Sequence, residues 1–165
     1  MLDDVEKLLR PQRYWHMQNG YCLPVAEDSM RCLGNRLASD QALLEQVKLS
    51  IKFGIHWDTQ VRTSPDLRVC QIFCSGLPCS YCHRTKRLQD WTVFASGVLD
   101  SAFEATFCTG AILAEQRQER VKVYLTGIGL GAFGNSAAWV NHSIESVVQK
   151  FKDAPIDVYL VKFGH

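Results

Sequence analysis

Residues 121–161 of this 165-residue chain read VKVYLTGIGLGAFGNSAAWVNHSIESVVQKFKDAPIDVYLV. The β-branched run at the start of this stretch predicts a strand over 121–126. Apolar side chains at helical spacing then predict a helix over 136–151, and a second β-branched run predicts a strand over 156–161. A strand, a helix and a strand in this order form a βαβ crossover, which implies parallel strands and a right-handed connection. The stretch therefore predicts an α/β domain.

A glycine-rich loop, TGIGLGAFGN at 126–135, joins the first of these strands to the helix. Glycines carry no Cβ atom, so their backbone N–H groups can approach an anion closely. The N-terminus of the following helix adds further N–H donors and a partial positive charge. The loop therefore predicts a site for a phosphate or a diphosphate. The alternative is a tight turn in which the glycines serve packing alone.

Two common kinds of phosphate-binding loop fit this sequence poorly. Gly129, Gly131 and Gly134 match the G-x-G-x-x-G fingerprint of dinucleotide-binding domains. That fold continues through further βα units and places an acidic residue at the end of the next strand, whereas here Asp157 begins that strand. No Gly-Lys-Ser or Gly-Lys-Thr sequence is present, which disfavours the P-loop of nucleoside triphosphatases.

The rest of the chain continues the same α/β pattern. We expect a helical N-terminal segment over 1–50, packed on an α/β core over 51–165. A turn is expected at Asn19-Gly20, and Ser39 is expected to cap a helix. Apolar spacing and alternation predict the other elements, which are helices near 2–9, 30–37 and 43–49, strands over 51–57 and 69–74, and a long helix over 89–116.

Composition indicates one folded domain. Apolar residues make up 47% of the chain and charged residues 21%, which excludes an intrinsically disordered chain. The 18 basic and 17 acidic side chains leave a net charge of +1, so we expect neither nucleic acid nor a membrane as a partner. No export signal or membrane span is recognised, and seven cysteines then favour free thiols and a cytoplasmic location.

Several segments, taken in order, resemble the divergent macro-like ADP-ribosyl hydrolases. They are GIHWDT at 54–59, IFCSGLP at 72–78, FEAT at 103–106 and the glycine loop at 126–135. The resemblance covers roughly the chain from Trp15 to its end. It implies a three-layer α/β/α macro-like fold with a mostly parallel sheet, here with extra helices at the N-terminus.

The resemblance implies ADP-ribose, free or attached to a modified protein, as the ligand. In macro domains the corresponding loop wraps the diphosphate, and its aromatic residue, here Phe133, packs against the distal ribose. The alternative for this side chain is an ordinary core aromatic. The ligand-binding residues that the resemblance implies are Gly127, Gly129, Leu130, Gly131, Ala132, Phe133, Gly134 and Asn135.

A macro domain also has a first loop that grips the proximal ribose, and nothing before Ile51 resembles it. We therefore expect this chain to correspond to the C-terminal portion of such a domain. A missing N-terminal half or a partner chain would then complete the sheet. Without the first loop we expect weakened binding of ADP-ribose and little or no turnover.

Two carboxylates, Glu104 and Asp58, are the candidates for catalysis. A glycosidic bond to ribose breaks through an oxocarbenium-like state, and a carboxylate could activate water or stabilise the positive charge. His56 lies two residues before Asp58, on the same side of an extended strand. The alternatives are a helix-surface charge for Glu104 and a hydrogen-bonded pair at the strand end for His56 and Asp58.

The cysteines offer a different class of function. The sequence Cys79-Ser-Tyr-Cys82-His83 matches the C-x-x-C-H signature of haem attachment, which normally belongs to exported proteins. Cys70 and Cys74 could join these residues in a zinc site, but a structural zinc site uses two paired ligand turns and the sequence has one. We therefore expect no metal and no cofactor. The remaining hypotheses are an ADP-ribosyl hydrolase, a non-catalytic ADP-ribose reader or inactive fragment that acts through protein contacts, and a cysteine-based metal protein.

Overall fold

The structure is a computed structural model that describes residues 1–82 and 87–161. With 49% of its residues in helices and 23% in strands, the chain is a mixed α/β protein, as its sequence predicts. Its elements in chain order are α1 (Asp3–Leu8), β1 (Trp15–Gln18), β2 (Tyr21–Pro24), α2 (Ser29–Ser39), α3 (Gln41–Ser50), β3 (Gly54–Val61), β4 (Ser64–Phe73), η1 (Cys79–Tyr81), η2 (Leu88–Trp91), α4 (Thr92–Arg117), β5 (Val121–Leu125), η3 (Gly131–Phe133), α5 (Ala137–Lys150) and β6 (Ile156–Leu160).

The βαβ unit predicted over 121–161 is confirmed. Strands β5 and β6 pair in parallel along their whole length, and α5 connects them. The hydroxyl of Ser136 caps α5 by accepting a hydrogen bond from the backbone N–H of Ala138 at 3.2 Å. Val123 and Leu125 of β5 are buried in one cluster with side chains of α4 and α5. This unit therefore holds the glycine-rich loop between a strand and a capped helix.

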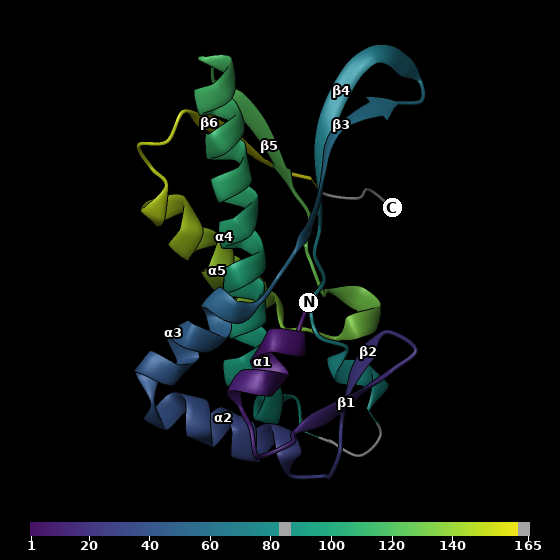
Figure 1. The fold of residues 1–165 in the computed structure, drawn as a ribbon, viewed down its shortest axis with the longest axis vertical. Helices are drawn as coiled ribbons and strands as arrows, with labels where there is room; N and C mark the ends of the chain where they lie inside the picture. Colours follow the sequence, from purple (N-terminus) through teal and green to yellow (C-terminus); the bar gives the residue numbers. More distant parts are fainter. Residues whose placement is uncertain (83–86, 162–165) are drawn as a thin grey trace.

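Helix α4 is the core helix of the protein. Figure 1 shows it along the long axis, with α2 and α3 near one end and α5 beside it. Its first turns pack on the N-terminal segment, where the rings of Trp15 and Phe94 stack at 5.1 Å. Its later turns, including Phe103 and Phe107, pack on α5 and β5. One helix thus joins the two hydrophobic clusters that stabilise the fold.

The apolar character of this helix has a further consequence. The segment Leu88–Arg117 is long and apolar enough to cross a membrane by length and composition alone. In the fold, 56% of its apolar window is buried inside the protein. Buried side chains lie all around α4 rather than along one stripe, as expected for a helix packed on both sides.

The N-terminal segment is not wholly helical, which corrects the expectation for 1–50. Strands β1 and β2 form an antiparallel hairpin over residues 15–24. The turn predicted at Asn19-Gly20 is confirmed, with φ values of 50° and 81°. Asn and Gly adopt positive φ more readily than other residues, and a two-residue turn of this kind matches the twist of paired strands. The turn therefore closes a hairpin rather than an open loop.

Helices α2 and α3 form where the apolar spacing predicts them, but the cap differs. The carboxylate of Asp40 accepts a hydrogen bond from the backbone N–H of Leu43 at 2.9 Å. Ser39, the expected cap, is the last residue of α2 instead. A single residue, Asp40, thus separates the two helices and starts the second.

The described strands do not form one mostly parallel sheet, which is the second correction. They pair as three two-stranded sheets, of which β1–β2 and β3–β4 are antiparallel and β5–β6 is parallel. The strands predicted over 51–57 and 69–74 exist as β3 and β4, but both extend toward a short turn at 62–63. Strands joined by so short a turn pair with each other in the antiparallel sense. Figure 1 shows this hairpin standing away from the helices.

Candidate functional site

The glycine-rich loop over 127–135 has a backbone that glycine alone adopts without strain. Gly129, Gly131 and Gly134 have φ values of 77°, 68° and 70°, in the left-handed region. The loop includes η3, which opens at Gly131 and ends before Gly134. Three of the glycines that the sequence singles out are therefore required by the shape of the loop itself.

Part of the hydrogen-bonding capacity of this loop is used internally. Four backbone N–H groups donate to carbonyls of the loop or of Thr126 over 2.9–3.2 Å, namely those of Ile128, Leu130, Gly134 and Asn135. The N–H groups of Gly131 and Ala132, at the start of η3, have no hydrogen-bond partner within the described residues. These two donors remain for a bound group. Only part of the loop therefore offers donors to the phosphate group that the sequence predicts.

Asn135 links the loop to a second loop over 75–78. Its side-chain Nδ2 donates a hydrogen bond to the backbone carbonyl of Leu77 at 2.6 Å, and the residue is buried. The two backbones also approach each other so closely that a side chain on Gly76 would not fit. A Cβ atom there would lie 2.8 Å from the Cα of Gly129. The amide nitrogen of Asn135 thus holds the two loops together, while its Oδ1 is buried without a hydrogen-bond partner among the described residues. A role of Asn135 in ligand binding stays a prediction.

Three aromatic side chains gather beside the glycine-rich loop, and we call them the aromatic cluster. Tyr81 of η1 and Phe133 of η3 have ring centroids 5.3 Å apart, and Tyr21 of β2 lies 5.0 Å from Tyr81 and 6.1 Å from Phe133. All three pairs meet edge to face, a favourable geometry for aromatic rings. The two tyrosines are partly exposed. The cluster is thus an open aromatic surface next to the loop.

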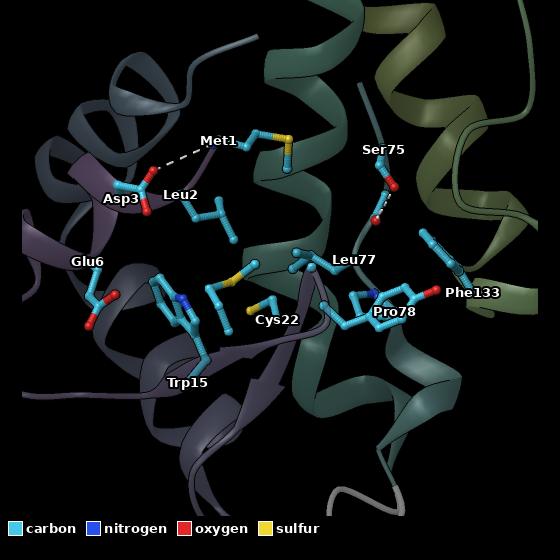
Figure 2. Close-up of a pocket in the computed structure, with 14 residues that line it drawn as sticks. Met1, Leu2, Asp3, Glu6, Trp15, Cys22, Ser75, Leu77, Pro78 and Phe133 are labelled. Carbon is cyan, nitrogen blue, oxygen red and sulfur yellow. Dashed lines mark hydrogen bonds and ion pairs between the residues drawn. The ribbon is translucent and has the colours of Figure 1, made fainter. Parts of the chain in front are cut away.

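A cavity of about 390 Å³ opens between the N-terminal segment, the β1–β2 hairpin and the 75–78 loop. Figure 2 shows Asp3 and Glu6 on one side of it and Phe133 on the other. Its volume falls within the usual range of small-molecule sites. The side chains between these sides are largely apolar, and they include Leu2, Trp15, Met17, Tyr21, Leu77 and Pro78.

The polar groups of the cavity are few. The indole N–H of Trp15 is buried and has no hydrogen-bond partner within the described residues. Glu6 lies 3.5 Å from the Arg13 guanidinium in a surface ion pair, and the N-terminal amino group of Met1, which also lines the cavity, lies 3.9 Å from the carboxylate of Asp3. At the other side of the cavity, an anionic group could bind near Phe133, beside the unpartnered amides of η3. Hydroxyl or amino groups fit the side with the carboxylates.

The two candidate catalytic carboxylates do not line this cavity. Glu104 lies on α4, where it accepts a hydrogen bond from Lys150 of α5. Asp58 is exposed on β3, at a bulge where its φ is 51°. His56 does not hydrogen-bond to Asp58, and its ring stacks on Phe73 at 6.4 Å. The structure therefore keeps both carboxylates outside the cavity.

The cysteines are spread over several elements. Within residues 1–82 and 87–161, no three His, Cys, Asp or Glu side chains converge as a metal site requires. Cys70 lies on β4, Cys74 follows it, and Cys79 is buried in η1. Cys82 packs against the N-terminal hydrophobic cluster, and His83 lies outside the described residues.

The buried thiols predict a loss of stability at high pH. Burial raises the pKa of Cys79 to about 12 and raises the pKa of Cys22 as well. Above the ordinary thiol pKa of 9.0, unfolded chains release protons that the folded protein retains, so the free energy of unfolding falls as the pH rises. Each thiol contributes at most about 1.4 kcal/mol per pH unit. Denaturant unfolding at pH values below and above 9.0 measures this decline. The free energy of unfolding should fall less steeply with pH for Cys79→Ala than for the unmodified chain. Equal slopes would contradict the raised pKa of Cys79.

Sequence reasoning found one side of this site and missed the other. It singled out Phe133 and the glycine-rich loop, but it gave no ligand-binding role to Trp15 or Tyr21. The signal for them is the Asn19-Gly20 dipeptide, which favours the tight turn of a hairpin. No family model, curated protein or solved structure matches this chain.

Proposed function

We propose that the 127–135 loop, the aromatic cluster and the adjoining cavity bind ADP-ribose. The observation that carries the proposal is the position of Phe133. This residue lines the cavity and also belongs to η3, whose first two amides are without partners among the described residues. One ligand with a diphosphate and flat or sugar rings would use both features together.

The diphosphate would bind at the start of η3. A Cβ atom on Gly131 would meet no atom within 4 Å, so the space in front of this residue is open. Its N–H and that of Ala132 could donate to phosphate oxygens, and hydrogen bonds to charged acceptors are stronger than those between neutral groups. This supports an anionic group at the Phe133 side of the cavity.

The ring-bearing part of the ligand would occupy the apolar middle of the cavity. Met17 and Tyr21, which line the cavity and are exposed, offer the apolar and flat surfaces that a base or a ribose contacts. Asp3 and Glu6 could accept hydrogen bonds from ribose hydroxyls or an amino group.

The proposal concerns binding first. The three-layer macro-like architecture, with ADP-ribose or an ADP-ribosylated protein as partner, belongs to the same proposal, and the βαβ unit with its glycine-rich loop supports it. Removal of ADP-ribose by Glu104 or Asp58 stays a prediction. Neither carboxylate lines the cavity, so catalysis by these residues is not part of the proposal. A cytoplasmic location also stays a prediction.

Calorimetric titration with free ADP-ribose tests the proposal. Replacement of the aromatic ring in Phe133→Ala should weaken binding by about tenfold or more, since an aromatic contact contributes on the order of 1 kcal/mol beyond its buried area. Phe73→Ala is the matched control, because Phe73 is an exposed phenylalanine that does not line the cavity. This variant should bind like the unmodified chain.

Two results would contradict the proposal. One is the absence of measurable heat at millimolar ADP-ribose with the unmodified chain. The other is equal binding by Phe133→Ala and Phe73→Ala, because the cavity side of the loop would then contribute nothing. Circular dichroism spectra of both variants should match that of the unmodified chain, so that a loss of binding reports on the site.

A further inference from the structure

The two cysteines of the Cys79-Ser80-Tyr81-Cys82 segment have no role in the proposed function. The segment folds as the 3₁₀ turn η1, in which the backbone N–H of Tyr81 donates a hydrogen bond to the carbonyl of Pro78 at 3.1 Å. Cys79 opens the turn, and Cys82 follows its last residue. Both cysteines carry thiols in this structure rather than a disulfide. The turn therefore holds two oxidisable groups three positions apart.

The geometry of the turn brings these two thiols within range of a disulfide bond. A 3₁₀ helix rises by about 2.0 Å per residue and repeats every three residues, so Cα atoms three positions apart lie about 6 Å from each other with their side chains on the same side. Cα atoms joined by a disulfide are usually about 4.4–6.8 Å apart. Cys82 lies just after η1 and has an extended backbone, with φ −98° and ψ 106°. A small rotation at this one residue can therefore bring its sulfur to that of Cys79 without unwinding the turn.

The surroundings of the two sulfurs favour a disulfide over charged thiolates. Cys79 is 6% exposed in the N-terminal hydrophobic cluster, and Cys82 packs against the same cluster. Burial raises the pKa of Cys79 to about 12, so its thiol gains no stabilisation from ionisation at neutral pH. Dithiols whose reduced form is stabilised have disulfides that are easily reduced. The buried pair lacks this stabilisation of its reduced form, so a disulfide between its members should resist reduction.

We propose that Cys79 and Cys82 form a reversible disulfide across η1 by exchange with a low-molecular-weight disulfide. Cys82 is the more exposed of the two, so it loses its proton and attacks the oxidant first, which gives a mixed disulfide and releases one thiol. Cys79 then loses its proton and attacks the sulfur of Cys82, and the second thiol leaves. Together the two cysteines lose two electrons and two protons, which the oxidant takes up as it becomes two thiols.

Cys22 of β2 is the competing partner for either cysteine. It is buried in the same cluster, and the charge of an ionised Cys79 or Cys82 would raise its pKa, so its thiol lies near both. Cys22 lies on a different element, however, and no turn sets its spacing from the other two. The spacing fixed by η1 therefore favours the bond between Cys79 and Cys82.

The bond would span the two residues of η1 that contact the glycine-rich loop. The ring of Tyr81 lies 5.3 Å from that of Phe133, and the hydroxyl of Ser80 fills the space that a Cβ atom on Gly134 would need. A covalent link between the ends of η1 restricts the conformations of both residues. Oxidation would therefore fix the Tyr81 side of the aromatic cluster, and reduction would release it.

Cysteine mapping after equilibration with glutathione measures the bond directly. The unmodified chain is incubated with an excess of oxidised over reduced glutathione, its remaining thiols are blocked with N-ethylmaleimide, and it is unfolded in urea. Chymotrypsin then cleaves after Tyr81, which separates Cys79 from Cys82 unless a disulfide joins them. The two peptides should be recovered joined by a disulfide, and treatment with dithiothreitol before blocking should yield them as separate peptides.

Three variants locate the bond. In Cys82→Ala, Cys79 should stay a thiol under the same conditions, because the buried residue depends on Cys82 for the first attack. Cys22→Ala should still yield the joined peptides. Cys32→Ala is the matched control, because Cys32 is an exposed cysteine of α2, and it should behave like the unmodified chain. Circular dichroism should show that all three variants keep their helices.

Three results would overturn the proposal. One is the recovery of separate peptides from the unmodified chain in excess oxidised glutathione. Another is a stable mixed disulfide of Cys82 with glutathione, because Cys79 would then be out of reach. The third is a bond from Cys22 to either cysteine. The mapping uses no ADP-ribose, so its outcome is independent of the calorimetry that tests the proposed function.

Discussion

Phe103→Ala should lower the free energy of unfolding by about 3–5 kcal/mol. Phe103 is fully buried on α4, in the cluster that also holds Leu99, Phe107 and Val123. Removal of its ring loses the transfer free energy of the apolar atoms and leaves a cavity that the packed helices cannot close. Because domains of this size are stable by roughly 5–15 kcal/mol, the loss should be visible as a large drop in the urea midpoint.

Ile112→Ala provides the control on the same helix. Ile112 is exposed on α4, so its truncation changes little buried area and should alter stability by less than about 0.5 kcal/mol. The helix propensity of alanine affects both variants in the same sense. Similar midpoints for Phe103→Ala and Ile112→Ala would show that the α4–α5 packing does not limit stability.

The parts of the fold that follow from local sequence could be predicted. The β-branched runs and the apolar spacing of 121–161 fix two strands and a helix, and the observed β5, α5 and β6 lie within one residue of the predicted bounds. The long helix over 89–116 is likewise found as α4, shifted by a few residues after η2. In these segments the pattern within a short window is enough to choose the element.

The parts that depend on distant contacts could not be predicted. Strand pairing in particular depends on which strands meet, so β3 and β4 form a separate hairpin although the resemblance implies one mostly parallel sheet. The hairpin over 15–24 had a local signal in Asn19-Gly20, but its short strands lack a clear alternation. Local patterns thus predict elements more securely than the partners of those elements.

The candidate site shows the same division. The glycine-rich loop and Phe133 could be singled out, because glycine spacing between a strand and a helix has a direct chemical meaning. The role of Asn135 could not, because it depends on the carbonyl of Leu77, which lies 58 positions earlier in the chain. Trp15 and Tyr21 reach the cavity only through the hairpin that carries them.

Gly129→Ala should strongly destabilise the protein, with an expected loss of about 2–5 kcal/mol in the free energy of unfolding. The φ of Gly129 is 77°, a conformation that strains any residue with a Cβ atom. The new Cβ would also lie 2.8 Å from the side-chain Cγ of Asn135, which is too close. Displacement of Asn135 would leave the buried carbonyl of Leu77 without its hydrogen bond.

Gly131→Ala separates these two effects, because the two glycines share a backbone conformation but not a neighbourhood. Gly131 has a φ of 68°, and a Cβ there would meet nothing within 4 Å. The free energy of unfolding of this variant should therefore fall only by the contribution of backbone strain, about 1–2 kcal/mol. The difference between the two variants in denaturant unfolding measures what the contact between Asn135 and the 75–78 loop contributes. Equal losses would mean that the backbone conformation alone stabilises the loop, and the wall of the cavity formed by 75–78 would then not depend on Asn135.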